Sequence, residues 1–282
     1  LSSGRLFVAI NAKTYLRYSD DNGVSWNSVK SLGNAHVLEY VISTPSDELF
    51  VVAQDGNFYS KDAGQTWTSL GVQAFNTLTI TGMVYTHSGK LLVSTRFSPL
   101  YISADKGTTW TTVPANALKN PHSTGSGDSE FGSPAEDLAG SLYLVGQEDE
   151  TLFQSKDSGK TWAAVNSDEM DFSFYIDQNN WFYKMVANGA PAGIYISKDQ
   201  GATYSMLIPP PGGFIENMTV QSDGNFYFDG MGVGLYQAVT NSTTPKVIFS
   251  DTFSAFVPYI VAKNNGILVS DRYLGLVHYY TK

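Results

Sequence analysis

Short strand-like runs alternate with polar turns along the whole chain. Within the runs, apolar and polar side chains tend to alternate from one residue to the next. Residues 43–67 and 86–110 both show turn, strand, turn, strand and tight turn in that order. A period of two is typical of β-strands, and the helical period of 3.6 is nearly missing. The pattern therefore predicts an all-β protein built from short antiparallel strands.

One polar turn motif occurs five times in the chain, with the consensus S-x-D-x-G-x-[ST]-[WY]. Its aspartates are Asp21, Asp62, Asp105, Asp157 and Asp199, and their spacings are 41, 43, 52 and 42 residues. A period of about 42 residues is the length of one four-stranded propeller blade. The repeat therefore predicts a β-propeller.

The residue types of this turn suit a local fastening better than catalysis. The aspartate can accept hydrogen bonds from its own turn, and the glycine supplies a left-handed step. The Ser or Thr can bond back across the hairpin, and the tryptophan buries a large apolar surface. The predicted structural residues are Ser19, Asp21, Gly23, Trp26, Ser60, Asp62, Gly64, Trp67, Ser103, Asp105, Gly107, Trp110, Ser155, Asp157, Gly159, Trp162, Ser197, Asp199, Gly201 and Tyr204.

This turn resembles the Asp-box, or BNR repeat, of sialidases, xyloglucanases and Vps10 propellers. The resemblance covers about residues 1–204. It implies that each box joins the third and fourth strands of a blade. It also implies that the boxes lie on the face away from the ligand.

Two further units, 216–249 and 255–281, keep the strand pattern without the turn motif. We therefore expect a seven-bladed β-propeller of four-stranded antiparallel blades in a single domain, 1–282, with a six-bladed ring as the alternative. The first blade is expected to lack its inner strand and the last to end at its third, through N-terminal truncation or an unrecognised closure. The approximate blades are 1–30, 31–70, 71–113, 114–165, 166–208, 209–250 and 251–282.

Charge and composition exclude several classes of function. The net charge of −9 argues against nucleic acid and anionic membrane as partners, and the lack of a long apolar run argues against insertion into a membrane. The chain has no cysteine, and its four histidines are scattered, so no cofactor or metal site is predicted. The carboxylates of residues 148–150 would bind calcium only weakly.

The predicted ligand face is the one opposite the repeated turns, where loops of neighbouring blades converge. Two arginines on that face each precede an aromatic residue, and the long insertion 114–130 lies in the blade next to the first of them. An arginine beside a ring offers both hydrogen bonds and stacking. Strand phase places Asp55 there too, and Phe75 is expected on the same face between two blades. The predicted ligand-binding residues are Arg96, Phe97, His122, Asp128, Glu130, Arg272 and Tyr273.

Catalytic signatures are missing from the sequence. A sialidase needs three arginines for its substrate carboxylate, whereas this chain has four arginines in all and no F/Y-R-I-P motif. No motif marks the carboxylate pair of another glycoside hydrolase.

We therefore expect a secreted or otherwise extracytoplasmic, non-catalytic binding propeller for glycan or protein ligands. The alternatives are a polysaccharide-active hydrolase or lyase of the Asp-box type, and an assembly factor.

Overall fold

The described part of the chain covers most strands and the turns that join them. The computed structural model describes residues 1, 3–10, 15–29, 32, 38–96, 100–113, 118, 131–146, 151–166, 174–186, 191–208, 215–221, 225–230, 234–239, 245–249, 259–263, 266–270 and 277–281.

The described residues form 26 β-strands and a 3₁₀ helix, η2 (Ala74–Thr77), which confirms the all-β prediction. Within these ranges no helix is both long and apolar enough to cross a membrane. The strands fall into two compact units, one of residues 1–119 and 126–134, the other of 120–125 and 135–282.

The first unit holds three sheets whose strands pair in chain order. Their strands are β1 (Leu6–Ile10), β2 (Tyr15–Ser19), β3 (Asn27–Ser28); β4 (Leu38–Ser43), β5 (Leu49–Ala53), β6 (Gly56–Ser60), β7 (Thr68–Gly71); and β8 (Ile80–Tyr85), β9 (Leu91–Thr95), β10 (Leu100–Ser103), β11 (Thr111–Val113).

The second unit holds four sheets of the same kind. Their strands are β12 (Ala135–Glu136), β13 (Leu142–Gly146), β14 (Thr151–Ser155), β15 (Ala163–Asn166); β16 (Phe174–Ile176), β17 (Phe182–Val186), β18 (Gly193–Ser197), β19 (Ser205–Ile208); β20 (Ile215–Val220), β21 (Asn225–Gly230), β22 (Gly234–Val239), β23 (Lys246–Phe249); and β24 (Tyr259–Lys263), β25 (Gly266–Ser270), β26 (Val277–Thr281).

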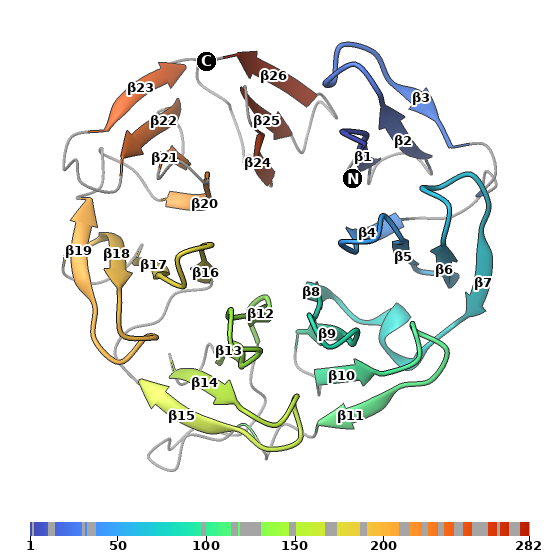
Figure 1. Cartoon of the computed structure of the whole chain (residues 1–282), viewed down its shortest axis with the longest axis horizontal. Coiled ribbons are helices and arrows are strands. Elements are labelled where there is room, and N and C mark those ends of the chain that lie inside the picture. Colours follow the sequence, from blue (N-terminus) through green and yellow to red (C-terminus); the bar gives the residue numbers. More distant parts are fainter. Residues whose placement is uncertain are drawn as a thin grey trace. The chain divides into compact units, whose positions relative to one another are not determined.

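Within each unit the sheets meet along their first strands. In the first unit β1 contacts β4 and β4 contacts β8, as Figure 1 shows. In the second unit β12 contacts β16, and β20 contacts β24. Each sheet is an antiparallel meander. This is the arrangement of consecutive propeller blades, and we call the first strands of complete sheets the inner strands.

The prediction of seven four-stranded blades is wrong. Five sheets have four strands, while the described terminal sheets β1–β3 and β24–β26 have three each. The described strands thus fall two short of seven complete blades. The sequence analysis had included both terminal units among the seven blades, although it expected each of them to be incomplete. The expectation of an incomplete first and last unit agrees with the three described strands in each terminal sheet.

The second strands are buried on both faces, which the predicted alternation of apolar and polar positions did not anticipate. Every residue of β5, β9, β13 and β17 is buried. One apolar cluster joins two sheets, because Phe50 and Val52 of β5 pack with Leu91 and Val93 of β9. A strand covered on both faces needs a continuous apolar run, as in LFVVA of β5.

A second fastening closes the hairpins between first and second strands in the second unit. One oxygen of Asp137 accepts the backbone N–H groups of Ala139 and Ser141 at 2.9 and 2.8 Å, and the other accepts the Tyr143 hydroxyl at 3.1 Å. Asp177 makes the equivalent three bonds in the next sheet. Both aspartates are buried, so these bonds satisfy groups that water does not reach.

An amide network fixes η2 between the second and third sheets. Asn57 and Asn76 exchange two side-chain hydrogen bonds, at 3.2 and 2.8 Å. Asn76 also donates to the Ala53 carbonyl oxygen and accepts the Gln73 N–H at 2.6 Å. Both asparagines are buried, and their bonds tie the link before β8 to the β5–β6 hairpin.

Replacing Asn76 with alanine should lower the free energy of unfolding by about 1–3 kcal/mol, because it strands buried partners on three segments. Urea denaturation measures this loss. The control Val72→Ala lies in the same link on a side chain that is 62% exposed, and it should change stability by less than about 0.5 kcal/mol. Equal effects of the two substitutions would contradict the role given to the network.

Candidate binding site

In the repeated turns, nearly all of the polar groups are hydrogen-bonded to one another. In the second sheet one oxygen of Asp62 accepts the Ser60 hydroxyl and the Thr66 N–H, both at 2.8 Å. Its other oxygen accepts the Thr66 hydroxyl at 2.5 Å, and the Gly64 N–H donates to Ser60 at 2.8 Å. The remaining four turns repeat these contacts. The structural role predicted for these residues stays a prediction, but few of their groups are left for a ligand.

The turn needs two successive left-handed residues, where the sequence had suggested one. The residue before each glycine also has a positive φ, between 57° and 61°. These residues are Asn22, Ala63, Lys106, Ser158 and Gln200. A Cβ added at Gly201 would lie 2.5 Å from the Leu152 side chain of the preceding sheet, so that side chain would have to shift.

Hydrogen bonds hold the turn aspartates in the ionised form. The pKa is lowered to about 2 for Asp21, Asp62, Asp157 and Asp199, with the bond from the turn Ser or Thr hydroxyl as the largest cause. The pKa of Asp105 is lowered for the same reason. Groups of this kind do not donate protons near neutral pH.

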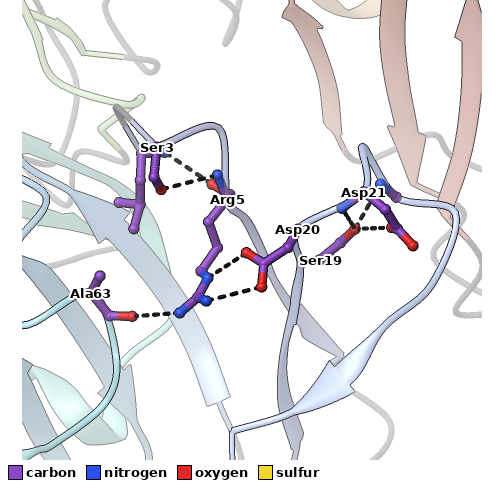
Figure 2. A network of polar contacts seen from close by, with 8 residues as sticks. Ser3, Arg5, Ser19, Asp20, Asp21 and Ala63 are labelled. Carbon is purple, nitrogen blue, oxygen red and sulfur yellow. Dashed lines mark hydrogen bonds and ion pairs between the residues drawn. The ribbon is translucent and has the colours of Figure 1, made fainter.

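The turns also join consecutive sheets, which the sequence analysis missed. Arg5 donates to both carboxylate oxygens of Asp20, at 2.7 and 2.9 Å, and to the carbonyl oxygen of Ala63 at 3.4 Å. Figure 2 shows Arg5 between the first sheet and the turn of the second, while Asp21 bonds within its own turn. Arg5 therefore couples two neighbouring sheets.

The third sheet is joined to the second in a comparable way. Lys106, in the turn of the third sheet, donates to Glu48 at 2.6 Å and to the Tyr59 hydroxyl at 3.2 Å. In the second unit, Asn166 of one sheet donates to the Ala202 carbonyl oxygen of the next at 3.1 Å. The end of the sheets that carries the turns is thus occupied by contacts within the protein.

The opposite end of the second and third sheets differs. The β5–β6 turn lies there, and β4 begins there because Leu38 pairs with Ala53. The contacts of Asn76 with Ala53 and Asn57 place the start of β8 at this end as well. We call the four residues Glu39, Gln54, Thr81 and Arg96 of this region the bulge end.

The inner strands are interrupted at the bulge end. The register of β4 shifts between Leu38 and Tyr40, and that of β8 shifts between Ile80 and Gly82. In the second unit the register of β20 shifts between Ile215 and Met218. Glu39 and Thr81 are the residues at the first two shifts. A β-bulge redirects a side chain out of the regular pleat and is common beside binding sites.

The bonding of the Glu39 side chain is incomplete. The Gln54 side chain donates to its carboxyl group, but the buried Oε2 atom has no hydrogen-bond partner among the described residues. Burial raises the pKa of Glu39, and the Gln54 bond opposes the rise. By contrast, the Thr81 hydroxyl donates to Ser94 at 2.9 Å.

Only one of the predicted ligand-binding residues can be placed. Arg96 is exposed at the bulge end, where its N–H donates to the Thr79 carbonyl oxygen at 2.8 Å. Phe75 is buried, so its assignment to an open ligand face is wrong. The others lie outside the described residues, and these are Phe97, His122, Asp128, Glu130, Arg272 and Tyr273.

No three acidic or histidine side chains are grouped to hold a metal ion in the described ranges, and residues 148–150 lie outside them. Sequence reasoning missed Glu39, although one signal was present. It is a single acidic residue in the otherwise apolar β4 segment LEYVIS.

A family model, the DUF6242 beta propeller domain, matches residues 2–206. The chain belongs to this family. No curated protein matches the chain. The family and the sheet arrangement confirm the β-propeller fold, whereas the specific Asp-box assignment is not established by them.

Solved structures similar to this DUF6242 propeller share its fold at low identity. YCF48 bound to a D1 peptide has a TM-score of 0.70 and 15% identity, over 98% of this chain and 88% of YCF48. Virginiamycin B lyase from Staphylococcus aureus has a TM-score of 0.76 and 10% identity, over 100% and 92%. The GH74 xyloglucanase from Xanthomonas campestris has a TM-score of 0.71 and 14% identity, over 98% of this chain and 52% of the enzyme.

Removing the Thr66 hydroxyl should raise the pKa of Asp62 above about 2, because that hydroxyl is the largest cause of its lowering. The folded pKa lies below the unfolded value of about 3.9, so the stabilisation is present above that value and is lost as the pH falls toward 2. Thr66→Val should therefore show a smaller acid-dependent loss of stability than the parent.

Carboxyl-carbon NMR titration and urea midpoints between pH 7 and 2.5 measure the two effects. Thr66→Ser keeps the donor and is the control. A pKa that remains near 2 in Thr66→Val would refute this account of the turn.

Proposed function

We propose that this chain is an extracytoplasmic, non-catalytic binding propeller that takes a glycan or polypeptide ligand at the bulge end. We further propose that the repeated turns are Asp-boxes whose task is to fasten the blades. The observation that carries the proposal is the incompletely bonded Glu39 at the redirected start of an inner strand.

The contrast between the two ends of the sheets supports this choice. At the repeated-turn end, the carboxylates of Asp20 and Glu48 are each paired with a cation of the protein. At the bulge end, an exposed arginine and a half-buried glutamate lie on neighbouring sheets. The Oε2 atom of Glu39 is an acceptor without a partner among the described residues, and such a group on a rigid strand favours ligand binding.

Structural neighbours are compatible with a binding role. YCF48 has been solved with a bound peptide, so this fold accommodates a polypeptide ligand in at least one relative of similar length. The enzymes among the neighbours share 14% identity or less with this chain. Similarity at that level indicates a common fold and transfers no catalytic residue. The xyloglucanase also has about as much chain again beyond the matched part.

A screen on arrays of oligosaccharides and of peptides, scored for both binding and cleavage, tests the proposal. We expect saturable binding without cleavage of the bound compound. Turnover of any bound oligosaccharide would replace the binding role by the hydrolase or lyase alternative. No binding to either array would contradict the proposal.

Arg96→Ala should weaken binding of the compound found by about tenfold, the loss expected for one hydrogen bond from a charged group. Isothermal titration calorimetry measures the affinity. Lys61→Ala is the matched control, since it removes the same charge from an exposed position at the repeated-turn end. If both variants bind as the parent does, Arg96 lies outside the site.

A further inference from the structure

The carboxyl group of Glu39 has an unusual position for an acidic residue. It stands in an apolar inner strand, and its Oε2 atom is shielded from solvent without a partner in the described structure. A shielded acceptor without a partner is costly, and the cost is greater for a charged one. The Glu39 carboxylate at this bulge is therefore better explained by binding a ligand than by stabilising the strand.

Other carboxylates of the same unit are paired with a cationic side chain of the protein itself. Arg5 binds Asp20 through both oxygens, and Lys106 binds Glu48 at 2.6 Å. No lysine or arginine of the described residues pairs with Glu39. Its contact with Gln54 is to a neutral amide, which leaves the carboxylate charge uncompensated.

A cation suits the Glu39 carboxylate better than a neutral donor does. The attraction of an opposite charge offsets more of the desolvation of a half-buried carboxylate than a neutral hydroxyl can. The net charge of −9 would also draw cationic ligands toward the protein. A metal ion is a poorer candidate, since no group of three ligating side chains is found in the described part.

We infer that the bulge end binds a lysine or arginine side chain of a polypeptide through the Glu39 carboxylate. This inference rests on the proposed function and narrows its ligand to a cationic polypeptide. A neutral glycan is the competing occupant.

The test uses unstructured peptides in matched pairs, one with lysine and one with acetyl-lysine, together with neutral oligosaccharides and the free diamine putrescine. We expect the lysine peptides to bind, their acetylated partners to bind at least about tenfold more weakly, and added salt to weaken the binding. Putrescine should bind much more weakly than the lysine peptides. These arms use the parent protein and need no variant to fold.

Glu39→Gln should lower the affinity for the lysine peptides by at least about tenfold. Asp47→Asn is the control, since it makes the same change in net charge at the repeated-turn end. Asparagine tolerates the φ of 62° at that position. Urea midpoints of both variants confirm that they are folded.

Each other outcome overturns the inference in a distinguishable way. Equal losses of affinity in Glu39→Gln and Asp47→Asn would show that the peptides are attracted by overall charge alone. If putrescine bound as tightly as the lysine peptides, the ligand would be a small amine and not a polypeptide. If the protein bound an oligosaccharide with an affinity that Glu39→Gln did not change, the inference of a cationic ligand would be wrong and the proposed binding function would remain. If no probe bound, both the cationic ligand and the proposed binding function would be contradicted.

Discussion

The structure depends on the burial of the second strands β5, β9, β13 and β17 on both of their faces. A single sheet of this kind leaves an apolar surface on either side, and another element of the structure must cover it. The cluster of Phe50, Val52, Leu91 and Val93 is what results when two such strands meet across neighbouring sheets. Turns, networks and salt bridges then determine how the sheets are fixed to one another, but the need to stack them comes from these strands.

Stacking also explains why the repeated turn requires glycine and a carboxylate together. The turn of one sheet packs against the sheet before it, so a Cβ at Gly201 would meet Leu152 and one at Gly64 would lie 3.1 Å from Phe7. A tight turn of this shape points several N–H and hydroxyl donors inward. A carboxylate with two oxygens satisfies them, as Asp62 does with Ser60 and Thr66. The residues that the motif conserves between its copies are therefore those that geometry leaves least free.

Sequence reasoning reached the fold because its evidence was periodic. Five copies of one turn reported both the strand content and the blade length, and the structure follows them in the sheets that contain them. It failed where no repeat existed. The count of seven four-stranded blades failed at the terminal units, and Phe75 was assigned to an open face because a loop position does not reveal burial. The Asn57–Asn76 pair joins residues that lie 19 positions apart, and nothing local marks such a contact.

The candidate site was predictable only in part, for a related reason. Arg96 was found through strand phase, because the end of a second strand can be counted from the repeated turn. Glu39 was missed because its importance comes from a bulge, which breaks the phase on which such counting depends. A bulge frees one side chain from the pleat without disturbing the sheet on either side of it. The inner strands can thus carry a ligand group such as Glu39 while their neighbours keep the apolar surface that stacking requires, so that binding and stability are assigned to different residues of the same strand.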